Sequence, residues 1–155
     1  MKKVSPSYQV LIISIASPLL IGIYEEGVLI KEIKSEEKTS EILLKILMEI
    51  IEEYPLSRLI YTSGPGSYMA IKLTYITLRS LEILKEIKFE ACDAFSLNQK
   101  NPIKAMGKLY FIKENNTIIT KKFDEAVEQR FKLPSMLSEV AILNDNKPMY
   151  ILPAV

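Results

Sequence analysis

The side chains that could carry out chemistry form a short inventory, because the 155-residue chain contains no histidine. Catalysis by Ser/His/Asp or Cys/His groups, histidine acid–base catalysis and the usual zinc sites are therefore excluded. Aspartate occurs only at Asp93, Asp124 and Asp145, so none can hold a metal within the first 92 residues. The groups that remain for chemistry are glutamate, lysine, serine, tyrosine and the backbone.

One short segment, Ser63-Gly64-Pro65-Gly66-Ser67, has the composition of an anion-binding loop. A loop that joins a strand to a helix exposes unpaired backbone N–H groups, which can bind phosphate. The segment lacks the spacing and lysine of a Walker loop and the Gly-x-Ser-x-Gly pattern of a nucleophile elbow. Two interpretations stay open: Gly64, Gly66 and Ser67 lie close to an anion or nucleotide, or the glycines allow a tight turn and Ser67 caps a helix.

Charge gives little sign of a nucleic-acid surface. The chain has 20 Lys+Arg and 19 Asp+Glu, a net charge of +1, and no Lys/Arg run exceeds two residues. We therefore expect any RNA to be held mainly by other subunits. The length suits one main domain, with or without a small addition.

The apolar stretch Val10–Tyr24 raises the question of a signal peptide or membrane anchor. Ser14, Ser17 and Pro18 interrupt it, and it is shorter than the roughly 20 residues that a membrane span needs. We expect two buried strands there and no membrane association. The single cysteine, Cys92, excludes an internal disulfide, and we expect a small buried residue in a cytoplasmic protein.

The elements that must position these residues follow from hydrophobic patterning and from turn residues. Three strands come first, then a helix that Thr39 or Ser40 could cap, a strand, a longer helix and a fifth strand. The expected ranges are Tyr8–Ile15, Leu19–Tyr24, Val28–Lys34, Glu41–Tyr54, Arg58–Thr62, Tyr68–Ile87 and Phe89–Ala94. This order predicts an α/β protein built on the ribonuclease H-like half-domain of actin, sugar kinases and chaperone ATPases. A doubly wound nucleotide-binding fold would not open with a three-stranded meander.

The remainder of the chain, from about Asn98, has a different composition. We expect a hairpin around Asn115-Asn116, a short helix and one more strand. The ranges are Lys108–Lys113 and Thr117–Lys121 for the hairpin, Asp124–Arg130 for the helix and Met149–Leu152 for the strand. We divide the chain into a first domain, residues 1–98, and a reduced second lobe, residues 99–155, packed on the first.

Both long helices carry more apolar surface than one face of a sheet can cover. On the first, a narrow polar stripe is the only interruption of apolar residues. On the second, the expected core face consists of Met69, Leu73, Ile76, Ile83 and Ile87, which leaves another, tyrosine-rich stripe. That stripe either packs on the first helix or meets a partner, and tyrosine suits interfaces. We favour a partner, with interface residues Leu44, Met48, Ile51, Tyr68, Ile71, Tyr75 and Leu78.

The glycine-bearing loop and the helix after it resemble the TsaB family, also called YeaZ. The segment Ser63–Leu73 is similar to the family pattern G-P-G-S-[FY]-T-G-[LI]-R, with the best agreement over Gly64–Tyr68. The order of elements and the closing residues 148–152, similar to P-x-Y-L, agree as well. The chain has Ser14-Ile15 where the family has Asp-Thr, and Lys104-Ala105-Met106 where the family has Asp-Ala-Arg. It resembles a shortened TsaB.

The resemblance implies a subunit without catalytic residues, metal or cofactor of its own. TsaB-like proteins pair through their two helices with the catalytic subunit TsaD, and the ATPase TsaE joins them. The complex forms threonylcarbamoyladenosine at position 37 of tRNAs that read ANN codons. The resemblance further implies a homodimer when the chain is alone, and a nucleotide, ATP or ADP, at the partner interface. The alternative function is an ATP-dependent phosphotransferase, which would need the aspartate and glycine-rich turn missing from Ser14–Leu19.

Overall fold

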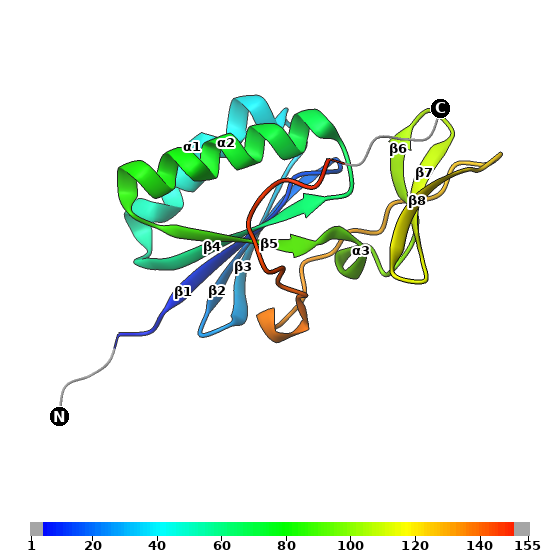
Figure 1. The fold of residues 1–155 in the computed structure, drawn as a ribbon. Helices are drawn as coiled ribbons and strands as arrows, with labels where there is room; N and C mark the ends of the chain where they lie inside the picture. The colour runs from blue at the N-terminus through cyan, green and yellow to red at the C-terminus, as the bar shows by residue number, and fades with distance from the viewer. Residues whose placement is uncertain (1–4, 151–155) are drawn as a thin grey trace.

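The computed structural model describes residues 5–150, and a five-stranded mixed sheet lies at its centre. The strands lie in the order β3-β2-β1-β4-β5, with antiparallel pairing among the first three and parallel pairing of β4 with β1 and β5. Both long helices, α1 and α2, cover one face of this sheet (Figure 1). The predicted order of these seven elements is confirmed. Their bounds are β1 Tyr8–Ile13, β2 Leu19–Glu25, β3 Val28–Ser35, α1 Thr39–Glu53, β4 Leu56–Gly64, α2 Tyr68–Lys85 and β5 Lys88–Asp93.

Strand β1 shows why the first apolar run of the sequence does not alternate. Val10 and Ile12 belong to the core beneath α1 and α2, whereas Leu11 and Ile13 belong to a second core on the opposite face. All four side chains are fully buried. A strand covered on both faces needs apolar residues at every position, which is the reason that the continuous run predicted a buried strand.

The start of α1 differs from the prediction. The helix begins at Thr39, its N-cap residue is Lys38, and no side chain caps it. The expected cap at Thr39 or Ser40 is therefore wrong, because both residues lie inside the first turn. The backbone N–H groups of Glu41 and Ile42 instead donate to the Lys38 carbonyl at 2.9 and 3.2 Å.

A three-stranded antiparallel sheet follows, set apart from the two long helices (Figure 1). The hairpin around Asn115-Asn116 is confirmed, with both asparagines at positive φ (50° and 63°), as a two-residue type I′ turn requires. The short helix α3 and the first strand of this sheet, β6, were not predicted. The bounds are α3 Ala94–Leu97, β6 Ile103–Met106, β7 Leu109–Glu114 and β8 Thr117–Lys122.

Residues 123–150 contain one turn of 3-10 helix, Leu137–Glu139, and are otherwise irregular. The helix expected at Asp124–Arg130 is absent from the structure. Its polar groups bind the neighbouring sheet instead: the Val127 N–H donates to the Tyr110 hydroxyl, and the Gln129 amide donates to a carbonyl of the chain before β6. These bonds hold the segment extended over the small sheet, so tertiary contacts override the local helical pattern.

The final residues return to the first sheet. Met136 forms an isolated bridge with Val28 at one edge, and Ile142 forms another with Cys92 at the other edge. Of the strand expected at Met149–Leu152, the described part, residues 149 and 150, is not in a strand, and residues 151–152 lie outside the described part of the chain. Within residues 5–150, no helix has both the length and the apolar character to span a membrane.

Candidate functional site

The outward side of α2 carries a line of exposed apolar side chains. Met69, Ile76 and Ile83 repeat every seven residues, about two turns of helix, so they lie above one another on the same side. Their exposed fractions are 77, 52 and 72%, and the adjacent Leu84 is 75% exposed. Large apolar residues grouped on one side of an exposed helix indicate an interaction site more than isolated ones do.

Helix α1 extends this apolar surface. Leu44 is 54% exposed, and Met48 and Ile51 are half-buried at the margin of the core. Ser40, one turn before Leu44, lines the same cavity as Leu73 of α2, so this side of α1 faces α2. We call the combined surface the outer helical face. It consists of Leu44, Met48, Ile51, Met69, Leu73, Ile76, Ile83 and Leu84.

The structure reverses the predicted roles of the two stripes on α2. Ile71 and Leu78, expected at a partner interface, are fully buried against the sheet. Met69, Ile76 and Ile83, expected in the core, are exposed. These five assignments are wrong. The remaining members of the expected core face differ less: Leu73 is half-buried and Ile87, just beyond the helix, is buried.

The two tyrosines of the predicted stripe lie at the border of the outer helical face. Tyr68 is 38% exposed, and its ring centroid lies 4.9 Å from that of Tyr150. Tyr75 is half-buried, with ring contacts at 6.4 and 5.8 Å to Tyr61 and Phe89. Tyr75 therefore packs mainly on the core of the chain itself, while Tyr68 is accessible beside the start of α2.

A buried threonine lies in the middle of the face of α2 that packs on the sheet. Thr74 lies on the buried face between Ile71 and Leu78, with no exposed surface, and its hydroxyl forms a 2.7 Å hydrogen bond with the equally buried Ser14. The tyrosines of this stripe were the reason for placing it outside. The signal that could have corrected the prediction is Ser80, a polar residue within the supposed core face between Ile76 and Ile83.

Charged side chains surround the outer helical face. On α1 the exposed Glu41, Glu49 and Glu52 lie beyond the apolar residues, and Lys72 lies at the far side of α2. The Arg79 guanidinium is held there by Glu82 at 2.5 Å and by the Tyr75 hydroxyl, to which it donates at 2.9 Å. An apolar centre with a charged rim is the usual anatomy of a protein–protein interface.

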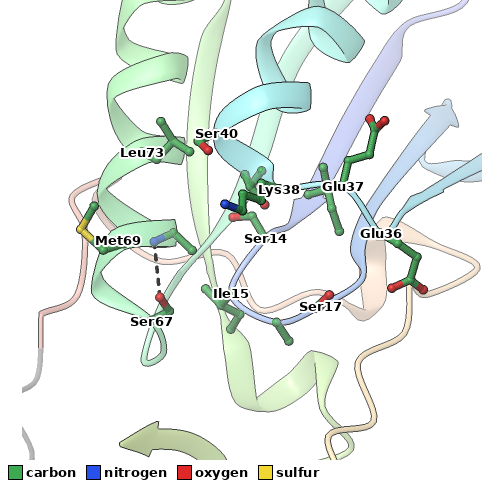
Figure 2. A pocket seen from close by; sticks show the side chains of 14 residues that line it. Ser14, Ile15, Ser17, Glu36, Glu37, Lys38, Ser40, Ser67, Met69 and Leu73 are labelled. Atoms are coloured by element: carbon green, nitrogen blue, oxygen red, sulfur yellow. Dashed lines mark hydrogen bonds between the residues drawn. The ribbon is translucent and has the colours of Figure 1, made fainter.

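A cavity of about 520 Å³ lies at one end of this face, between the first turns of α1 and α2 and the chain leaving β1. Figure 2 shows Ser14, Lys38 and Ser67 around it, with Leu73 and Met69 along the α2 side. The lining combines apolar side chains with hydroxyl groups and the start of two helices. Such a cavity can accept an apolar or polar group from outside the chain.

The glycine-bearing loop borders this cavity only through Ser67, which caps α2 by accepting a 3.5 Å hydrogen bond from the Ala70 N–H (Figure 2). A Cβ added to Gly64 would lie 2.8 Å from the Met149 carbonyl oxygen, and the Gly64 φ angle is +134°. A Cβ at Gly66 would lie 2.9 Å from that of Ile15. Close packing and a turn therefore account for both glycines, and the helix-cap interpretation accounts for Ser67.

The chemistry available around the cavity is limited. Among residues 5–150, no group of three or more acidic or cysteine side chains is arranged to hold a metal ion. The Cys92 thiol is fully buried, and burial raises its pKa, so it stays protonated and unreactive at neutral pH. Burial likewise raises the pKa of the Tyr61 hydroxyl, which donates to the Asn146 carbonyl at 2.7 Å.

Comparison with known proteins tests the fold independently. No protein-family model and no curated protein sequence matches the chain. Among solved structures, YeaZ from Pseudomonas aeruginosa superposes with a TM-score of 0.57 and 11% sequence identity over 88% of this chain. The chain has the YeaZ fold.

A second solved structure gives the same result. It is a protein described as uncharacterized, with similarity to the peptidase YeaZ from Pseudomonas aeruginosa, and it matches with a TM-score of 0.57, 11% identity and 88% coverage of this chain. The chain spans 67% and 66% of the length of the two YeaZ-fold structures. At this identity the similarity establishes the fold, and it agrees with the resemblance seen in the loop Ser63–Ser67.

Proposed function

We propose that this chain is a shortened TsaB-like subunit of the machinery that forms threonylcarbamoyladenosine on tRNA. Its role is to bind and support a TsaD-like catalytic subunit through the outer helical face. The proposal draws on the YeaZ fold, on the similarity of Gly64–Tyr68 to the family loop, and on the absence of histidine. The observation that carries it is the exposed apolar row Met69, Ile76, Ile83 and Leu84.

The position of that row favours pairing with another helical surface. Ile76 and Ile83 lie two turns apart on α2, and the half-buried Leu73 of α2 and Met48 of α1 belong to the same outer helical face. A partner helix laid along this face would bury the row and form a helical bundle. Burying large apolar side chains contributes roughly 25 cal/mol per Å², so covering this row would give a partner substantial binding energy.

Several finer points belong to the same proposal. The five-stranded sheet with its two helices corresponds to a ribonuclease H-like half-domain, and α1 and α2 would meet the homologous helices of TsaD. A TsaE-like ATPase would join this pair in the cytoplasm, with a nucleotide at the partner interface near the cavity at Ser67. Without TsaD, the same face would pair two copies of the chain. In this arrangement the chain contributes no catalytic residue.

Co-purification with a TsaD-like subunit tests the proposal. The wild-type chain should form a stable complex on size-exclusion chromatography, and Ile83→Glu should prevent it, because a carboxylate beside Leu84 at the end of the apolar row would be desolvated by the partner. A matched control is Met106→Glu on the small sheet, since Ile83 and Met106 are 72% and 68% exposed.

The control should leave the complex intact, and both variants should keep the melting temperature of the wild type because neither side chain is buried. Failure of the wild-type chain to bind TsaD, or equal loss of binding in the two variants, would contradict the proposal.

A further inference from the structure

The charges of the chain are divided between its two parts, although the total is close to zero. Residues 5–98 contain nine basic and thirteen acidic side chains, a net charge of −4. Residues 99–132, which form the small sheet and the segment over it, contain eight basic and four acidic side chains, a net charge of +4. We call residues 99–132 the basic lobe. The overall charge conceals a strongly cationic region.

The pairing of the strands places several lysines of this lobe near one another. Lys104 pairs with Tyr110 and Tyr110 pairs with Lys121, so the two lysines lie two strands apart on one face of the sheet, about 10 Å from each other. The Phe123 N–H donates to the Lys108 carbonyl at 2.9 Å, which brings Lys108 beside the end of β8. Every lysine of the sheet and its turns is exposed: Lys100, Lys104, Lys108, Lys113, Lys121 and Lys122.

Most of these charges are not neutralised by neighbours. Among the residues that the structure describes, Lys113 alone of the six forms an ion pair, with Asp93 at 3.9 Å. The acidic side chains of the lobe are Glu114, Asp124, Glu125 and Glu128, and Glu128 is paired with Arg130 at 3.5 Å. The net charge of +4 includes these four residues. Asp93, Glu32 and Glu139 of neighbouring elements lie beside Lys113 and Lys132, so the cationic surface is centred on Lys104, Lys108, Lys121 and Lys122.

A cavity of about 490 Å³ lies where the lobe meets the first sheet. Lys100 and Lys113 contribute to its wall, together with Asp93, Ser96 and the side chains of the Asn115-Asn116 turn. Because the Asp93 carboxylate pairs with Lys113 at 3.9 Å, only Lys100 of these two lysines lacks an ion pair among the described residues and can meet an oxygen atom of a phosphate group.

We propose that the basic lobe binds the phosphate backbone of a folded RNA. By the alternation of strands, Lys104 and Lys121 lie on one face of the small sheet, and Lys113 and Lys122 lie on the other. A flat anionic membrane would meet one face at a time, whereas a folded RNA can follow both. Because the small sheet lies apart from the two long helices (Figure 1), a protein partner on the helices and an RNA on the lobe would contact different residues.

The choice of RNA as the polyanion rests on the proposed function, in which the substrate is a tRNA. It departs from the expectation, based on the total charge, that tRNA is held mainly by other subunits. Binding through phosphates is electrostatic and independent of base sequence, so it should weaken steeply with salt. Each lost phosphate contact should lower the slope of log K against log salt by about 1.

Fluorescence anisotropy tests the inference by measuring the binding of a labelled tRNA to the purified chain. The titrations run from about 50 to about 200 mM KCl, the range over which phosphate contacts weaken strongly. The double variant Lys104→Glu/Lys121→Glu should bind at least about tenfold more weakly than the wild type and reduce the salt slope by about 2. Lys31→Glu/Lys34→Glu is the matched control, because it makes the same charge change on exposed residues of β3. The control should retain most of the wild-type affinity and salt slope.

Three results would overturn the inference. The first is no tRNA binding by the wild type at about 50 mM KCl, and the second is equal weakening of tRNA binding in both double variants. The third is that Lys104→Glu/Lys121→Glu loses binding to phosphatidylserine vesicles but keeps binding tRNA. Failure here is separate from failure of the proposed function. The Lys104→Glu/Lys121→Glu variant should still co-purify with a TsaD-like subunit, and Ile83→Glu should still bind tRNA.

Discussion

The orientation of α2 predicts a large difference between two neighbouring apolar residues, Leu78 and Ile76. Leu78 is fully buried against the sheet, whereas Ile76 is 52% exposed. Leu78→Ala leaves a cavity and should lower the free energy of unfolding by about 2–5 kcal/mol. Ile76→Ala removes about three methylene equivalents, about half of which are buried, and each buried one contributes roughly 0.8 kcal/mol. Because alanine also has a higher helix propensity than isoleucine, the free energy of unfolding should fall by about 1 kcal/mol or less.

Equilibrium unfolding in urea, followed by circular dichroism, measures both values. With a slope of about 2 kcal/mol per molar for a chain of this size, the midpoint should fall by about 1–2.5 M for Leu78→Ala and by at most about 0.5 M for Ile76→Ala. Equal shifts, or a larger shift for Ile76→Ala, would refute the orientation of α2 and with it the outer helical face.

Three further predictions concern buried groups around the sheet. Thr74→Val removes the partner of the buried Ser14 hydroxyl, so the free energy of unfolding measured in urea should fall by about 1–3 kcal/mol. Gly64→Ala adds a Cβ 2.8 Å from the Met149 carbonyl oxygen at a residue whose φ is +134°. Differential scanning calorimetry should therefore show a clear fall in melting temperature. An unchanged melting temperature would contradict the close approach of Met149 to Gly64. Burial raises the pKa of the Cys92 thiol in the folded chain above its value of about 8.5 in the unfolded chain. Burying the neutral thiol therefore does not reduce the free energy of unfolding below about pH 8.5, and that free energy falls as the pH rises above this value. The thiol should react with a disulfide reagent at pH 8, about half a unit below that value, only after urea is added; rapid reaction in the native state would contradict its burial.

The first sheet could be predicted because its signals are local and mutually consistent. The unbroken apolar run at Val10–Ile13, the turn at Glu26-Gly27 and the proline that follows α1 each fix one boundary. The order of elements then limits the topology to few choices, because strands joined through helices run parallel. The hairpin at Asn115-Asn116 was predicted for the same reason: its turn chemistry lies within two residues.

The parts that were missed depend on contacts between distant residues. The buried face of α2 includes Thr74, which is acceptable in the core only because Ser14, sixty positions earlier, offers a hydrogen bond. The segment Asp124–Arg130 is extended because Tyr110 and the chain before β6 take up its polar groups. Neither partner can be identified from the pattern of the segment itself.

The exposed apolar surface was predicted, but most of the residues that form it on α2 were not. The excess of apolar surface on the two helices was apparent from the sequence, and Leu44 is exposed, while its role at a partner interface stays a prediction. The choice between two apolar stripes on α2 needed the sheet. The cationic character of the small sheet was not apparent in the total charge, because the net negative charge of residues 5–98 compensates for it.

The central claim is that the outer helical face supports the modification of tRNA. Its most direct test is nucleoside mass spectrometry of tRNA from cells depleted of this chain and supplied with a variant. Threonylcarbamoyladenosine at position 37 should fall on depletion, recover with the wild type and with Met106→Glu, and stay low with Ile83→Glu. Unchanged modification after depletion, or full recovery with Ile83→Glu, would contradict the claim.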